Sequence, residues 1–303
     1  MKVEEKKDQS IYTYELPEGA LHQDFQVFEV KGEDINNKNY PHKTDRPHRH
    51  SYYEVCVFVN GSGRHEIDFH THSIHSNSIH FISPGQVHLI SREKDYHGYL
   101  IVFSKEFYAL GMHHDLLDNF PFFNNYHIHP LLNMDTKGFG ELLQLIDMIR
   151  RENRSRSKIN TEILRSYLQI FLLKCKQYYV EQFADKAKMH DPHYAQVQQF
   201  QTLVEKHFME YHLVQEYAEM MAISPAVLNK SVKKITGHTA LEIIMDRLVL
   251  QAKRLLIYTD LSNKEIAFRL KYNDPSYFTR MFKGKTNRSP SAFRKEMNEK
   301  YQF

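Results

Sequence analysis

Four polar side chains share one face of a short helical segment near the end of the chain. They are Ser276, Thr279, Arg280 and Lys283. The opposite face carries Phe278 and Phe282, which are four residues apart and can anchor the segment to a core. A helix with an apolar back and an Arg, Lys, Ser and Thr front fits the major groove of DNA. Hydroxyl and guanidinium groups there reach base edges, and ammonium groups contact phosphates.

A second set with the same spacing lies upstream. Its outward side chains are Ala226, Asn229, Lys230 and Lys233. Leu228 and Val232 form the inward face of this segment. We expect the Asn and Lys side chains to reach base edges or phosphates and the Ala methyl group to touch a thymine methyl. An arginine such as Arg280 at a guanine would contribute about 1–3 kcal/mol of discrimination.

A third group combines three histidines with one carboxylate. His48, His50 and Glu54 are separated by even numbers of residues, so in an extended strand they share a face. His88 follows a turn signal at Pro84-Gly85. Imidazole and carboxylate ligands in this combination suit a first-row transition metal with open positions. The alternative is structural: His48 and His50 brace the mouth of a barrel, and His88 fixes a turn by hydrogen bonding.

The two DNA-reading sets need elements that hold them rigidly. Two stretches predict a helix, a tight turn and a second helix; they occupy residues 213–234 and 262–294. In the first stretch Ser224 can cap a helix that opens at Pro225, and in the second Asp274 can cap one that opens at Pro275. Proline is favourable at the first helical position because its missing N–H has no helical partner there.

A long helix is predicted between these two stretches, from Thr239 to Tyr258. Its expected buried side is Leu241, Ile244, Leu248, Leu255 and Leu256. At about 1.5 Å per residue the helix spans roughly 30 Å. Successive major-groove faces on one side of DNA are about 34 Å apart. One chain can therefore present two recognition helices to adjacent grooves.

Residues 194–303 resemble the DNA-binding domain of the AraC-type transcription regulators, in which a long helix joins two helix-turn-helix units. The matching residues are Ala218, Ser224, Leu228, Lys233 and Gly237, then Arg247-Leu248, Ala252 and Leu255-Leu256, then Glu265-Ile266-Ala267, Asp274, Ser276-Tyr277-Phe278, Arg280, Phe282-Lys283, Ser289-Pro290 and Phe293-Arg294. Four positions depart from the family pattern. Lys230 replaces an arginine, Val232 a phenylalanine, and Lys271 and Asn287 each replace a glycine. Lysine is a poor substitute where a turn needs positive φ.

The first half of the chain alternates like short strands separated by turn signals. The predicted strands are Gln26–Val30, Tyr52–Val59, Arg64–Phe69, Ser78–Ile82 and Gly98–Phe103. This pattern favours a small barrel or a two-sheet roll. The histidine motifs resemble those of the cupin fold and of the sensor domain of AraC-type regulators. The resemblance implies a ligand pocket, for which we expect the lining residues His50, Tyr52, Glu54, Phe58 and His88.

Two helices with wide apolar stripes are predicted after the barrel, over Lys137–Arg151 and Ile159–Phe183. Packing on the barrel and on each other explains these stripes. The resemblance offers a second explanation, a helical interface that makes the protein a homodimer.

Charge and composition agree with a division into a sensor and a DNA-binding part. Residues 194–303 carry a net charge of +6, and residues 1–193 carry −3. Two cysteines are too few for a disulfide framework and indicate a cytoplasmic protein. No apolar run has the length of a membrane span. The predicted segments are 1–20, a tail; 21–135, a cupin-like barrel; 136–183, the helical segment; 184–193, a linker; and 194–303, the DNA-binding domain.

The predicted fold class is therefore α+β with two domains, a cupin-like β-barrel with flanking helices followed by an all-α domain. We expect a sequence-specific transcription regulator of activator type, controlled by a small-molecule effector in the barrel. Its expected partners are double-stranded DNA, a second copy of the chain and RNA polymerase, with no membrane. No catalytic residues and no cofactor are expected. The alternative is a cupin metalloenzyme fused to a DNA-binding tail, with a divalent transition metal on His48, His50, Glu54 and His88. A third class, a purely architectural DNA binder, leaves the pocket unexplained.

Overall fold

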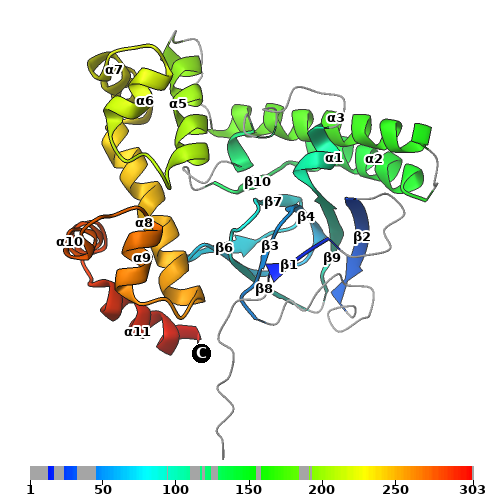
Figure 1. Cartoon of the computed structure of the whole chain (residues 1–303). Coiled ribbons are helices and arrows are strands. Elements are labelled where there is room, and N and C mark those ends of the chain that lie inside the picture. Colours follow the sequence, from blue (N-terminus) through cyan, green and yellow to red (C-terminus); the bar gives the residue numbers. More distant parts are fainter. Residues whose placement is uncertain are drawn as a thin grey trace, which may run out of the picture. The chain divides into compact units, whose positions relative to one another are not determined.

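The computed structural model describes most of the chain as two compact units. The described residues are 13–16, 24–32, 46–93, 95–109, 117, 120–123, 129–154, 158–183, 191 and 193–301. The units divide between Met189 and His190. Of the predicted linker 184–193, only residues 191 and 193 are among those described. The N-terminal unit is built on β-sheets and the other is entirely helical in its described part, so the protein has the expected two-domain α+β fold (Figure 1).

The described residues of the N-terminal unit form three sheets. Its strands are β1 (Thr13–Tyr14), β2 (Phe25–Lys31), β3 (Arg49–His50), β4 (Tyr53–Asn60), β5 (Gly63–Ile67), β6 (His70–Ile74), β7 (Ser78–Ile82), β8 (His88–Arg92), β9 (His97–Phe103) and β10 (Leu131–Asn133). The largest sheet has the order β10-β7-β4-β9-β2, and the second has the order β6-β5-β8. In the third, β1 and β3 pair in parallel. Apart from that pair, the named strands pair antiparallel.

Strand β4 separates two apolar cores. Val55 and Val57 belong to the core that also includes residues of the helices after the barrel. Cys56 and Phe58 belong to the second core, which fills the space between the sheets. Alternation along a strand sends neighbouring side chains to opposite faces, so a strand with a core on both faces is buried almost throughout.

The sequence pattern missed strands β1, β3, β6, β8 and β10. Strand β6 has the sequence His-Thr-His-Ser-Ile and is largely exposed, so it lacks the apolar alternation on which the strand predictions were based. It pairs with β5 across a tight connection in which Asp68 and Phe69 both have positive φ, 45° and 75°. Aspartate tolerates that geometry, but phenylalanine is not a usual signal for it.

Helices α2 (Thr136–Glu152) and α3 (Lys158–Phe183) pack against each other and contribute to the first core. Two shorter elements are also described in this unit, α1 (Lys105–Ala109) and the 3-10 helix η3 (Pro121–Phe123). The predicted packing of these helices on the barrel is thus observed. Among the described helices, none is both long and apolar enough to cross a bilayer.

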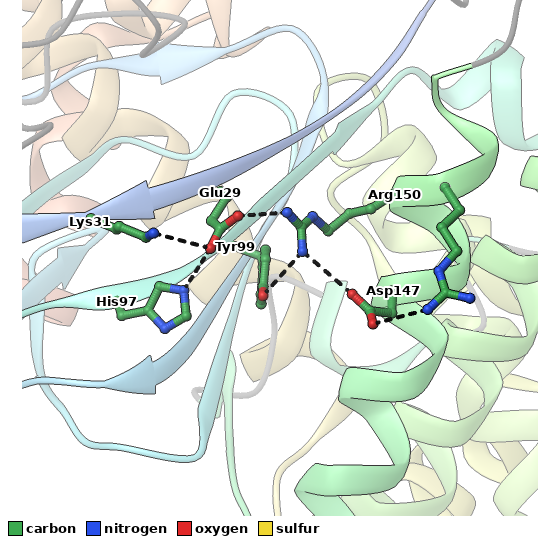
Figure 2. A network of polar contacts seen from close by, with 7 residues as sticks. Glu29, Lys31, His97, Tyr99, Asp147 and Arg150 are labelled. Atoms are coloured by element: carbon green, nitrogen blue, oxygen red, sulfur yellow. Dashed lines mark hydrogen bonds and ion pairs between the residues drawn. The ribbon is translucent and has the colours of Figure 1, made fainter.

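A polar network fastens the outer face of the large sheet to α2 (Figure 2). Arg150 donates from Nη2 to Glu29 in β2 at 2.5 Å, and its guanidinium lies 4.9 Å from the ring centre of Tyr99 in β9. Asp147 holds the other side of the same guanidinium at 3.4 Å. Glu29 also accepts from His97 at 3.1 Å. One arginine therefore ties two strands to a helix that is distant in sequence.

The second unit contains seven helices within its described residues. They are α5 (His193–His207), α6 (Val214–Met220), α7 (Pro225–Thr236), α8 (Ala240–Tyr258), α9 (Asn263–Arg269), α10 (Pro275–Thr286) and α11 (Pro290–Tyr301). Helix α8 runs between the α6–α7 pair and the α9–α10 pair (Figure 1). The predicted helix-turn-helix units and the connecting helix are all present.

The helix ends follow the predicted caps. Ser224 accepts from the Val227 N–H, and Asp274 accepts from the Ser276 N–H. Both following helices open with proline. One expectation for α8 was wrong: Leu241 is 47% exposed, because Ala240 and Ile243 are the residues that turn inward in its first turns.

Candidate DNA-binding surface and barrel site

The outer faces of α7 and α10 carry the side chains predicted to read DNA. Six of the eight are exposed, namely Ala226, Lys230, Lys233, Ser276, Arg280 and Lys283. Leu228 and Val232 in α7, like Phe278 and Phe282 in α10, are fully buried. Each helix is thus fixed by its back and presents a basic front. The lysines and the arginine supply the positive charge that phosphates attract.

The remaining two predicted residues, Asn229 and Thr279, are half-buried and make internal hydrogen bonds. The Asn229 side-chain carbonyl accepts from the Ala240 N–H at 3.1 Å, which joins α7 to the start of α8. The Thr279 hydroxyl donates to the Pro275 carbonyl at 2.9 Å. Both side chains therefore have a structural partner, and Asn229 retains its amide N–H donors for a base edge.

The two helix-turn-helix units repeat one another position by position. Thr236 and Thr286 each donate to the carbonyl four residues earlier, at 2.8 Å in both units. The helices end at residues in the left-handed conformation, Gly237 with φ 79° and Asn287 with φ 58°. Asn287 thus adopts the geometry of the glycine it replaces, which asparagine tolerates. The repeat places Lys230 and Arg280 at equivalent points on the two helices.

Sequence reasoning overlooked one exposed side chain on each of α7 and α10, at the third position of the helix. Val227 is 43% exposed and Tyr277 is 55% exposed. Each follows directly on a residue predicted to face DNA, Ala226 or Ser276. Val227 and Tyr277 occupy equivalent positions in the two units, and this repetition is the sequence signal that could have identified them.

Both helix-turn-helix turns contain a side-chain-bearing residue with positive φ. Ala222 has φ 53° and Lys271 has φ 58°. The turn that Lys271 occupies therefore keeps the left-handed geometry that glycine would favour, at a cost in strain of roughly 1–2 kcal/mol.

Two arginines of the family pattern hold the helices together. Arg247 in α8 makes a two-pronged pair with Glu205 in α5, with both N···O distances 2.8 Å, and lies over the Phe208 ring. Arg294 in α11 donates to the carbonyls of Leu256 and Leu261, each at 2.6 Å. Both arginines contribute to the rigidity of the reading surface rather than to its charge.

In the barrel, the predicted pocket residues all point into the interior core and are buried. They are His50, Tyr52, Glu54, Phe58 and His88, each no more than 2% exposed. The His50 ring stacks on Tyr52 with ring centres 4.5 Å apart. His48 and His88 form a two-way backbone bridge, with N···O distances of 3.0 and 2.8 Å, which sets their rings side by side.

Two further histidines join this group, and the sequence analysis did not single them out. His65 Nε2 is 2.9 Å from His88 Nδ1, and His65 Nδ1 is 3.0 Å from His80 Nδ1. Burial lowers the pKa of His65 well below its usual value and that of His80 to about 3. Both rings are therefore neutral at physiological pH. Since they lie on different strands, their meeting depends on strand pairing that spacing along the sequence does not show.

Glu54 borders the histidines. Its Oε2 lies 3.6 Å from His50 Nε2, and its Oε1 accepts from the Cys56 thiol at 3.3 Å. Burial raises the pKa of Glu54 to about 7, more than the Cys56 hydrogen bond and the Arg92 charge lower it. The three histidines His48, His50 and His88 each offer a ring nitrogen within 4.8 Å of the others. Of the four residues considered for a metal, the structure groups these three and leaves Glu54 at the edge.

Comparison with known proteins gives matches in both units. Residues 217–296 match the family model of a helix-turn-helix domain, and residues 33–166 match that of an AraC-like ligand binding domain. The transcriptional activator RhaS of Mannheimia succiniciproducens is 28% identical over 257 residues, covering 82% of this chain and 88% of that protein. The activator RhaR of an Enterobacter species is 19% identical over 255 residues, covering 84% and 89%. The solved structure of ToxT from Vibrio cholerae is 16% identical and covers 90% of this chain and 98% of its own, with a TM-score of 0.38.

Proposed function

The chain belongs to the AraC-type transcription regulators, helix-turn-helix activators with an N-terminal ligand-binding domain, and from this membership we propose which side chains read DNA and what controls them. Helices α7 and α10 enter successive major grooves on one face of the duplex. Lys230 and Arg280, together with Asn229 and Ser276, reach base edges. Lys233 and Lys283 contact the phosphates.

One observation supports this assignment above the others. Helices α7 and α10 are equivalent: each buries an apolar face and exposes a basic one. A single helix of 19 residues, α8, joins their two units. At about 1.5 Å per residue α8 is roughly 28 Å long, close to the roughly 34 Å repeat of DNA. A purely architectural DNA binder has no need for this register, since backbone contacts alone carry no sequence information.

The test is the binding of fluorescently labelled duplexes to the full chain, followed by anisotropy. A preferred duplex is first selected from a random pool, and a scrambled duplex serves as its reference. Arg280→Ala is expected to weaken binding to the selected duplex by about 1–3 kcal/mol and to erode the preference over the scrambled one. Lys295→Ala is the matched control, because Lys295 is 80% exposed on α11, away from the recognition helices.

Equal losses of affinity for the selected and the scrambled duplex would reassign Arg280 to a phosphate contact or to its 3.7 Å pair with Asp274. No binding to any selected duplex, with or without candidate ligands, would overturn the proposed function.

The barrel controls this activity by binding a small effector, which changes the relative populations of DNA-binding states. The acting form is a homodimer that contacts RNA polymerase. The exposed apolar side chains Ile159, Ile170 and Leu173 on α3 support the dimer, since 71%, 44% and 50% of their surfaces remain open. Sedimentation showing a monomer at micromolar concentration would exclude it.

The metalloenzyme alternative is not favoured, because the family is one of DNA-binding regulators, which are not enzymes. A cluster of buried histidines in the barrel then serves binding rather than turnover.

A further inference from the structure

We propose that His212 and Tyr272 are positioning residues that fix the angle between the two recognition helices, and with it the spacing of the DNA segments that one chain reads. The inference rests on the proposed function and deepens it, since it concerns what sets the spacing. His212 lies just before α6 in the first helix-turn-helix unit, and Tyr272 lies between α9 and α10 in the second. Their rings join the two units outside α8.

Three rings in series run from the first unit to the outer face of α10. The ring centres of His212 and Tyr272 are 4.9 Å apart, with an angle of 36° between the ring planes. Those of Tyr272 and Tyr277 are 5.8 Å apart at 37°. Both separations fall in the range of about 4.5–7 Å that is favourable for aromatic pairs. Tyr272 is 6% exposed and Tyr277 is 55% exposed, so the series leads from the interior to the surface proposed to face DNA.

Each ring of the central pair is anchored in its own unit. The His212 N–H donates to the Glu216 carboxylate in α6 at 2.9 Å. The Tyr272 N–H donates to the Ala267 carbonyl in α9 at 2.9 Å, and the Tyr272 ring also packs on Phe278, with ring centres 5.8 Å apart. A movement of one unit against the other therefore has to disturb the contact between the His212 and Tyr272 rings.

This contact adds a second connection to the one that α8 provides. Helix α8 contacts α6 and α7 in the first unit and α9 and α10 in the second (Figure 1). Long helices are rarely straight, so the angle between units attached to the two ends of one helix depends on its curvature. A ring contact outside the helix restricts that curvature, and with it the angle between α7 and α10.

The connection is made by the rings and not by hydrogen bonds. His212 Nε2 and the Tyr272 hydroxyl oxygen are both buried, and neither has a hydrogen-bond partner among the described residues. Burial lowers the pKa of His212 below its usual value, although the charge of Glu216 acts in the opposite direction, so the ring is neutral at physiological pH. A phenylalanine ring in place of His212 should therefore keep the contact.

The test measures how strictly the full chain requires one spacing. Fluorescence anisotropy compares the duplex selected from a random pool with two derivatives, in which one base pair is added to or removed from the segment between the two preferred half-sites. One base pair rotates a half-site by about 35° and shifts it by about 3.4 Å. The wild type should bind both derivatives more weakly than the selected duplex. The ratio of these affinities is the quantity to compare between variants.

Four variants show whether the rings set this ratio. His212→Ala removes the ring of the first unit, and Tyr272→Leu removes that of the second. Each should lower the ratio by roughly 2–10-fold, the effect expected from the loss of one aromatic pair. His212→Phe should keep the wild-type ratio. His207→Ala is the matched control, because His207 is also half-buried and its ring centre is 5.8 Å from that of Tyr211, but both rings belong to the first unit.

An unchanged ratio in folded His212→Ala or folded Tyr272→Leu would overturn the proposal and leave the spacing to α8 alone. Circular dichroism verifies folding, and if one of these two variants does not fold, the other decides. A wild type that binds all three duplexes equally overturns the proposal as well, and so does a His212→Phe variant that loses the preference. Absence of DNA binding by the wild type would refute the proposed function and this inference with it. Selective binding with an unchanged ratio in the variants would refute this inference alone.

Discussion

Single residues in the helix-turn-helix turns carry strain that the rest of the fold tolerates. Lys271 sits at φ 58° in the turn before α10, and Ala222 at φ 53° in the turn before α7. Both side chains are exposed, so neither gains burial in return. Close packing on either side holds the turns in place, with Ile266 and Phe278 fully buried around the second one.

We expect Lys271→Gly to stabilise the protein. It removes left-handed strain of roughly 1–2 kcal/mol, and the greater freedom of glycine in the unfolded chain offsets about 0.4–1 kcal/mol of that gain. A net gain of about 0.5–1 kcal/mol should appear as a higher midpoint in urea unfolding followed by circular dichroism. Lys271→Ala is the control, since it removes the charge and keeps the Cβ atom; an equal gain in that variant would point to charge rather than strain.

At the scale of elements, the polar network around Arg150 joins α2 to the large sheet (Figure 2). Burial acts to raise the pKa of Glu29, but the His97 hydrogen bond and the charges of Arg150 and Lys31 outweigh it and lower the pKa below 4.5. Because the folded-state pKa is depressed, this contribution to stability is present above about pH 4.5 and is lost as the pH falls through the lower folded-state pKa.

Arg150→Ala should therefore destabilise the barrel unit by about 1 kcal/mol at neutral pH through loss of the ion pair and of the contact with Tyr99. Unfolding measured from pH 7 to pH 3 should show the difference from wild type shrinking below pH 4.5. Arg151→Ala is the neighbouring control. Arg151 is 78% exposed, and its contact in this network is an ion pair with Asp147, with an N···O distance of 3.7 Å. A difference that stays constant with pH would mean that packing, not charge, accounts for the effect.

The elements were predictable to different degrees, for physical reasons. Helices α7 and α10 were predictable from local signals. Each is preceded by a capping residue, Ser224 or Asp274, and begins with a proline. Strand β6 gives no such signal, because its His and Thr side chains face solvent. The meeting of His65 with His88 and His80 follows from the pairing of β5 with β8 and the shared interior of two sheets. Long-range pairing of that kind is not encoded in residue spacing.

At the scale of the whole molecule, the proposed function has positive charge on two separate helices acting on one duplex. Lys230, Lys233, Arg280 and Lys283 are all exposed on α7 and α10. Each phosphate neutralised releases counterions, so the logarithm of the affinity should fall with the logarithm of salt concentration with a slope of about −0.9 per contact. If all four side chains engage phosphates at a non-specific site, they contribute about −3.6 to that slope.

Lys283→Ala should make the slope less negative by about 0.9 and weaken binding similarly on selected and scrambled duplexes. The measurement is anisotropy over a series of salt concentrations on both duplexes. Lys253→Ala is a suitable control, because Lys253 in α8 is half-buried and lies over the ring of Phe293 in α11. An unchanged slope in Lys283→Ala would exclude the phosphate contact.

Helix α8 can exchange residues freely on its exposed side but cannot change length. One inserted residue would lengthen it by about 1.5 Å and rotate everything beyond the insertion by about 100°. With α7 in its groove, the α10 front would then face away from the next major groove, although every side chain on both helices is intact. Insertions and deletions in this protein should accordingly collect in the loops of the barrel, and relatives should keep the 19-residue span of α8 while their recognition residues diverge.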